Sequence, residues 1–164
     1  MRMCLLVFVI VLSIALPGCG AAETFETLGE ISFPDTPGAH RNISFSVPKG
    51  AAAPVVHGEN GQLYVCEGYE LWSQTLPGGD IARTVKAVSG YASEELTVLQ
   101  QQAEGVKRYD FTWTSAGEQG ALIGRAAVLD DGNYHYVLAA MCDALDAGEL
   151  RGSWDTVFQS FSLG

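Results

Sequence analysis

The chain has little positive charge. Among its 164 residues, 9 are lysine or arginine and 19 are aspartate or glutamate, which gives a formal net charge of −10. An acidic surface repels phosphate backbones and anionic lipid head groups. We therefore expect no nucleic-acid partner, and any attachment to a membrane has to come from something other than a basic patch.

Motifs for catalysis, for metal binding and for phosphate binding are also missing from the sequence. The histidines His40, His57 and His135 stand alone, without the His-x-x-His spacing that puts two ligands on one side of an element. No serine lies in a Gly-x-Ser-x-Gly elbow, and no glycine-rich loop has phosphate-binding spacing. The sequence therefore predicts no cofactor and no metal, and a catalytic site would have to be assembled by the fold from dispersed residues.

The sequence lacks an apolar run of the roughly 18 residues that a membrane-spanning helix needs. Its longest run covers residues 4–16, follows Arg2 and leads into small residues and Cys19. A basic residue, a short apolar core and small residues, in that order, are typical of a cleaved export signal. We expect residues 1–18 to be such a signal.

The tetrapeptide Leu16-Pro17-Gly18-Cys19 resembles the bacterial lipobox. Leu16 and Gly18 match its aliphatic and small positions, whereas Pro17 stands where a small or hydroxyl residue is usual. The resemblance implies that Cys19 becomes an acylated N-terminus on the extracytoplasmic face of a bacterial membrane. More than one acyl chain is needed there, because a single chain binds only reversibly. The alternative is an ordinary secretory signal cut near residues 20–22, with Cys19 incidental.

The rest of the chain has the length of one domain that can bury its own core. Residues 19–40 mix acidic and hydroxyl residues with Phe25, Leu28, Ile31 and Phe33, which is too apolar for a free linker. We expect this segment to be a tether that lies partly against the domain. Residues 41–164 then form a single α+β domain.

Hydrophobic periodicity predicts the elements of this domain. Asp80 and Gly90 are the expected caps of a short helix, and residues 96–102 fit either a helix or a strand. A second helix near the C-terminus would bury Trp154, Val157 and Phe158. Alternation with a period of two predicts strands at residues 43–47, 63–76 (a hairpin that turns at 67–68), 109–114, 122–129 and 134–141.

Several of these segments resemble the PsbP-like α/β/α sandwich. They are ISFSVPKG at residues 43–50, the short helix after Gly79, the hairpin at Asp131-Gly132, and above all WDTVFQSF at residues 154–161. The resemblance implies an antiparallel sheet with helices packed on its faces, and it favours a strand at residues 96–102. Characterised members act mostly as binding or assembly accessories, and no family site motif maps onto this chain.

Four aromatic side chains lie near predicted turns and are the candidates for an exposed recognition surface: Tyr64, Tyr69, Trp72 and Tyr91. By contrast, Tyr109, Phe111 and Trp113 alternate along one strand and are expected in the core. Cys66 and Cys142 are the two cysteines left after Cys4 and Cys19. They either form a disulfide outside the cytoplasm or are small buried hydrophobes, which is the commoner use of a free cysteine.

Three functions fit these observations. The first is a non-catalytic, lipid-anchored module that binds an envelope protein or component, with the membrane itself contacted through the N-terminal lipid. The second is a small hydrolase whose site is assembled from His57, His135 and nearby carboxylates. The third is an assembly or stabilising factor for a membrane complex. A cleft in which histidine and carboxylate groups converge would favour the enzyme, and an open apolar patch away from the tether would favour binding.

Overall fold

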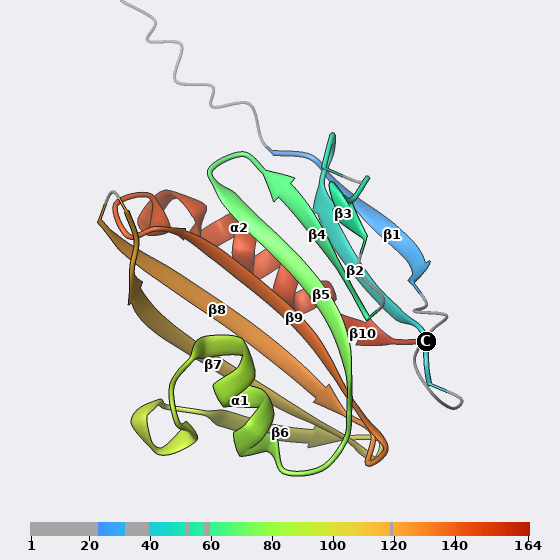
Figure 1. The fold of residues 1–164 in the computed structure, drawn as a ribbon. Coiled ribbons are helices and arrows are strands. Elements are labelled where there is room, and N and C mark those ends of the chain that lie inside the picture. The colour runs from blue at the N-terminus through green and yellow to red at the C-terminus, as the bar shows by residue number, and fades with distance from the viewer. Residues whose placement is uncertain (1–22, 32–39, 52, 58–59, 119) are drawn as a thin grey trace, which may run out of the picture.

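The computed structural model describes residues 23–31, 40–51, 53–57, 60–118 and 120–164 (Figure 1). Cys19 and the expected signal at residues 1–18 lie outside them. The described chain forms ten strands, two α-helices and a short 3-10 helix at Ser93–Glu95. In chain order the elements are β1 Phe25–Ile31, β2 Ile43–Pro48, β3 Val56–His57, β4 Gly61–Cys66, β5 Tyr69–Pro77, α1 Ile81–Ser89, β6 Leu99–Ala103, β7 Val106–Ala116, β8 Ala121–Asp130, β9 Tyr134–Asp143, α2 Ala147–Ser160 and β10 Ser162–Leu163.

The strands form two sheets. The larger sheet has seven strands in the order β3-β4-β5-β9-β8-β7-β6, and each neighbouring pair is antiparallel. The smaller sheet has the order β1-β2-β10. The expected hairpin at 63–76 and the meander of three strands after residue 105 are present, and a strand at 99–103 overlaps the segment 96–102. The predicted α+β fold is therefore confirmed.

The small sheet changes the expected role of the segment before residue 41. β1 pairs with β2 over most of its length, so that Phe25 faces Pro48 and Ile31 faces Ile43. Phe25 and Leu28 pack against buried core residues. Phe25 and Leu28 of the expected tether are thus part of the folded structure, which includes a strand before residue 41.

The ends of α1 are those that the sequence predicts. The Asp80 carboxylate accepts a hydrogen bond from the Ala82 backbone N–H at 3.0 Å, which caps the first turn. Gly90 ends the helix with a φ of 82°, a left-handed conformation that glycine adopts without strain.

The two helices cover opposite faces of the large sheet (Figure 1). α2 and β2 enclose the larger core with one face of β4, β5, β8 and β9, and Trp154, Val157 and Phe158 are buried there as expected. α1 covers the second core through Val85, together with Tyr109, Phe111 and Trp113 of β7, also as expected. Among the described residues, no helix is both long and apolar enough to cross a membrane.

Gly124 of β8 allows Trp113 to lie flat on the sheet. A Cβ at this position would fall within the Trp113 indole, so we expect Gly124→Ala to lower the free energy of unfolding by about 1–3 kcal/mol through overpacking. Gly152 is exposed in α2, and a Cβ added there would meet no atom within 4 Å. It is the matched control. Gly152→Ala should stabilise the protein by roughly 0.5–1 kcal/mol. Denaturant unfolding of both variants measures the difference, and equal stabilities would contradict this account of Gly124.

Candidate functional site

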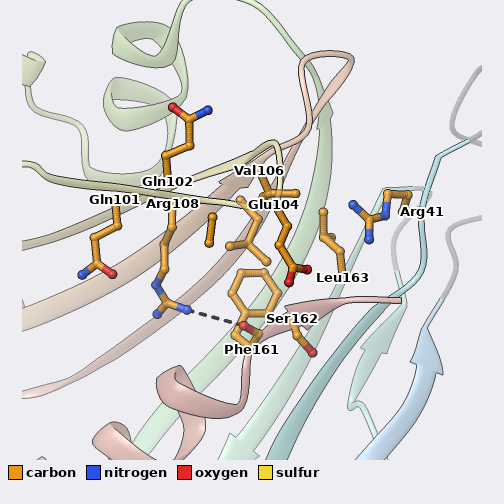
Figure 2. Close-up of a pocket in the computed structure, with 11 residues that line it drawn as sticks. Arg41, Gln101, Gln102, Glu104, Val106, Arg108, Phe161, Ser162 and Leu163 are labelled. Atoms are coloured by element: carbon orange, nitrogen blue, oxygen red, sulfur yellow. Dashed lines mark hydrogen bonds between the residues drawn. The ribbon is translucent and has the colours of Figure 1, made fainter.

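A cavity of about 330 Å³ lies where the end of β6 faces β10 (Figure 2). We call it the β6–β10 pocket. Its walls come from four separate parts of the chain: the segment before β2, the β6–β7 hairpin, β8 and the C-terminal segment. The lining residues are Arg41, Gln101, Gln102, Ala103, Glu104, Val106, Arg108, Leu129, Phe161, Ser162 and Leu163.

The floor of the β6–β10 pocket is apolar and fixed. Leu129 and Phe161 are buried members of the larger core, and Val106 and Leu163 pack against that core while remaining partly exposed. Polar side chains stand around this floor, with Gln101 and Glu104 on the strand side. The pocket can therefore take an apolar group whose polar end stays at the rim.

Arg108 forms one wall and is held in place on all sides. Its guanidinium forms a bidentate ion pair with Asp110 at 2.8 and 2.9 Å. It also donates to the backbone carbonyls of Phe158 at 2.8 Å and of Phe161 at 3.4 Å. These carbonyls belong to the C-terminal end of α2, which a cation stabilises. Because its charge is neutralised by Asp110, Arg108 shapes the pocket rather than offering a free cation.

Arg41 supplies the positive charge at the rim. Its side chain is exposed and points toward Leu163 (Figure 2), and its Nε donates to the carbonyl of Gly164 at 3.0 Å. Its backbone N–H donates to the Tyr136 hydroxyl at 2.8 Å, which in turn donates to Asp131 at 2.9 Å. A carboxylate at the mouth of the pocket would lie within reach of this guanidinium.

Asp131 is the acceptor at the end of that chain of hydrogen bonds. Burial acts to raise the pKa of its carboxyl group, but hydrogen bonds from the backbone N–H groups of Tyr134 and Asn133 and from the Tyr136 hydroxyl outweigh burial and lower it. Burial raises the pKa of Tyr136 to about 12. The network therefore consists of an ionised acceptor and a neutral phenol, and it fixes the start of β2 beside the pocket.

The structure does not bring the four predicted recognition aromatics together. Tyr64 and Tyr69 are buried, so their expected exposure is wrong. Alternation along β4 and β5 turns both rings toward the larger core, where they make edge contacts with Phe45 and Trp154 at centroid distances of 5.7 and 6.1 Å. Trp72 and Tyr91 are half-buried against the second core on the opposite face.

Trp72 and Tyr91 also belong to different hollows of the surface. Trp72 lines one of about 420 Å³ beside β3 and β4, and Tyr91 lines one of about 530 Å³ beside β7. The Tyr91 hydroxyl donates to the Thr114 carbonyl at 2.5 Å, which ties it to the sheet. These two aromatics remain partly accessible, but they form no common surface with Tyr64 and Tyr69.

Cys66 and Cys142 are buried free thiols. Each lies opposite Tyr69, Cys66 from β4 and Cys142 from β9. Two strand spacings place their Cα atoms roughly 9–10 Å apart, beyond the reach of about 7 Å that a disulfide allows. Burial raises the pKa of both thiols. The structure therefore gives both cysteines the role of core residues, with β5 standing between them.

His135, one of the two histidines named for an assembled catalytic site, is buried with 1% of its surface exposed. Its Nδ1 is 2.7 Å from the Thr84 hydroxyl, and its Nε2 is 3.9 Å from Asp130. This hydroxyl–imidazole–carboxylate row joins α1 to β9, but Thr84 is itself only 5% exposed. The backbone of His57 lies in β3, and its side chain lies outside the described residues. No group of three metal-ligating side chains occurs in the part of the chain that the structure describes.

Comparison with known proteins finds similarity among solved structures. No family model matches it, and no curated protein sequence is similar to it. Among solved structures it is similar to cyanobacterial PsbP (CyanoP) from Synechocystis sp. PCC 6803, with a TM-score of 0.55 and 12% identity over 91% of this chain and 99% of that one. It is also similar to the Ran-binding protein Mog1p from Saccharomyces cerevisiae, with a TM-score of 0.50 and 10% identity over 87% and 96% of the two chains. The fold is thus PsbP-like, as the sequence resemblance predicted.

The β6–β10 pocket was not found by sequence reasoning. Its lining residues come from distant parts of the sequence, and only the pairing of β10 with β2 brings Leu163 near Arg41. The one signal for the pocket in the sequence was the run Gln100-Gln101-Gln102. Three consecutive side chains that are neither charged nor apolar are unusual in a strand.

We expect His135 to make stability depend on pH. Burial lowers the pKa of its imidazole, although Asp130, Asp131 and Asp80 oppose the shift. The unfolded chain therefore takes up the proton first, and the free energy of unfolding should fall as the pH drops below about 6.5 toward the lowered pKa of the folded state. Thermal melts from pH 8 to pH 5 measure this loss. His135→Asn should be less stable at pH 8 but should lose less stability over that range, and parallel profiles would contradict the assignment.

Proposed function

We propose that the protein is a lipid-anchored, extracytoplasmic and non-catalytic binding module of a bacterial cell envelope. In this proposal residues 1–18 are removed as a signal, Cys19 carries the acyl chains, residues 19–40 lead to the domain and residues 41–164 form most of it. Support for the anchor comes from the order of Arg2, the apolar run at residues 4–16 and the lipobox-like tetrapeptide before Cys19. The acidic balance of the chain fits attachment through lipid rather than through charge.

The β6–β10 pocket is the observation that carries the binding role. It combines a rigid apolar floor with the exposed Arg41 guanidinium, in a chain whose balance is strongly acidic. It also lies at the correct end of the domain. Phe25, near the first described residue, pairs with the end of β2, whereas Leu163 in the pocket pairs with its start. A molecule docked in the pocket would therefore sit away from the anchor.

The ligand that suits this pocket is part of an envelope protein or component that presents an apolar group beside a carboxylate. The apolar group would cover Val106 and Leu163, and the carboxylate would meet Arg41. Mog1p, whose fold is similar, is a Ran-binding protein, and this supports the idea that the fold can serve as a binding scaffold. An assembly factor for a membrane complex would use the same surface, and no separate observation favours it.

The hydrolase alternative has less support. The row of Thr84, His135 and Asp130 has the residue types of a catalytic site, but a nucleophile must reach its substrate. Thr84 and His135 are buried beneath α1, where their contact fixes the helix to the sheet. We therefore assign this row a structural role.

The anchor is tested by Cys19→Ser in the producing organism. We expect the variant to leave the membrane fraction and appear in the soluble extracytoplasmic fraction, because the thiol that would be acylated at position 19 is gone. Fractionation followed by immunoblotting measures the change, and mass spectrometry of the wild-type N-terminus identifies the acyl chains. A variant that stays membrane-bound would refute the anchor and leave the pocket proposal untouched.

The pocket is tested by a photo-crosslinking residue placed at Leu163 in intact cells. We expect it to capture an envelope partner, and Arg41→Glu should reduce the yield several-fold by reversing the charge at the rim. The matched control is the same residue at Leu145, which is 96% exposed in the loop before α2. Equal labelling from both positions, or a yield that Arg41→Glu leaves unchanged, would count against the pocket.

A further inference from the structure

β6 is an edge strand of the large sheet that lacks the usual protection against pairing with another strand. This strand is the last in the sheet order, and all five of its residues are exposed. Natural edge strands are commonly protected by charge, by proline or by being very short. The opposite edge, β3, has only two residues, whereas residues 96–103 contain neither a charged residue nor a proline. Leu99 in this strand is 60% exposed.

The β6–β7 turn determines which backbone groups face outward. Glu104 and Gly105 both have positive φ, 52° and 83°, as in a two-residue type I′ turn. The flanking residues Ala103 and Val106 are paired, and in such a turn they form a hydrogen-bonded pair. Because hydrogen-bonded and non-hydrogen-bonded pairs alternate along an antiparallel ladder, the N–H and C=O groups of Gln100 and Gln102 point away from β7.

We propose that β6 pairs with β6 of a second copy of this chain, antiparallel and in a register centred on Gln100, so that the two large sheets become continuous. The outward groups of Gln100 would bond to those of the same residue in the second copy. The outward N–H and C=O groups of Gln102 would face the backbone groups of Val98 of the second copy. The inference goes beyond the proposed function and does not depend on the lipid anchor.

Charge is the reason that a second copy fits this edge. A strand that pairs with its own copy brings like residues together, and residues 96–103 carry no charge that would repel the same segment of the second copy. In the register centred on Gln100, Glu104 lies opposite Leu96 of the second copy and one position from its Glu95, so that acidic side chains approach each other only at the two ends of the seam. The interface is small and both copies are acidic, so we expect a weak association that added salt strengthens by screening.

The pairing would also complete the wall of the β6–β10 pocket. Gln101 and Ala103 line the pocket and share the face of the sheet that carries Arg108. In the proposed register, Leu99 of the second copy comes to lie beside Gln101, and its exposed side chain gains apolar contact. Dimerisation would therefore deepen the pocket on its open side.

A cysteine placed at the two-fold axis tests the proposal on the full chain in the producing cells. In Gln100→Cys the two Cα atoms would be about 5.5 Å apart, within the range of a disulfide. We expect mild oxidation to link most of the protein into a dimer on a non-reducing gel. Gln102→Cys is the matched control, equally exposed and facing the same way, but its copies would be about 14 Å apart. It should remain unlinked, and the buried Cys66 and Cys142 should add no background.

A proline at Gln102 separates strand pairing from chance collision. In the Gln100→Cys background, Gln102→Pro removes an outward N–H without touching the β6–β7 ladder, as edge strands tolerate, and should abolish the link. Gln102→Ala retains the N–H and should keep it, and thermal melts verify that both variants fold. Absence of a link at position 100, equal links at positions 100 and 102, or a link that survives the proline would each overturn the proposal. A partner strand from another protein would give the first of these results.

Discussion

The fold depends on burying β9 on both of its faces. β9 lies at the centre of the large sheet, between β5 and β8, and residues 135–140 are all buried. A strand in this position leaves its core incomplete until something covers each face. α1 covers one face, and α2 together with β2 covers the other. The α/β/α arrangement is therefore a consequence of one central strand that has no solvent-facing side.

Arginine side chains fix α2 over this strand. Arg125 of β8 forms an ion pair with Asp155 at 2.7 Å and lies over the ring of Phe158, with its guanidinium carbon 4.6 Å from the ring centroid. Arg108 of β7 holds the carbonyls at the end of the helix. Since α2 leads directly into β10, its orientation determines where Phe161 and Leu163 lie. The shape of the β6–β10 pocket thus follows from the way the helix is attached to the sheet.

Local patterns in the sequence predicted most of this fold because the interactions that decide it are local. Asp80 and Gly90 cap α1 through their nearest neighbours, and the hairpins around Gly68 and Gly132 use glycine at positive φ. Alternation also located the buried aromatics of β7. The strand at residues 99–103 could not be distinguished from a helix by pattern alone, because its side chains are exposed on both faces and carry no periodic signal.

What the sequence could not show depends on contacts between distant segments. β1 is recognisable only through its pairing with β2, across residues that the structure does not describe. The rings of Tyr64 and Tyr69 looked exposed because they lie near a turn, but the face on which they point is the one that α2 covers. The pocket needs Arg41, β6 and β10 together, and nothing in any one of these segments points to the others.

The pairing of β10 with β2 joins the two ends of the domain, and it can form only after the last residues have been synthesised. Ile43, Phe45 and Val47 are buried under α2 and Phe161, so the core around the early strand is completed only when the last residues have been synthesised. Such long-range closure delays compaction while the ribosome is still adding residues. Under the proposed export of the chain, late closure would be an advantage, because the core could not be completed before translocation ends.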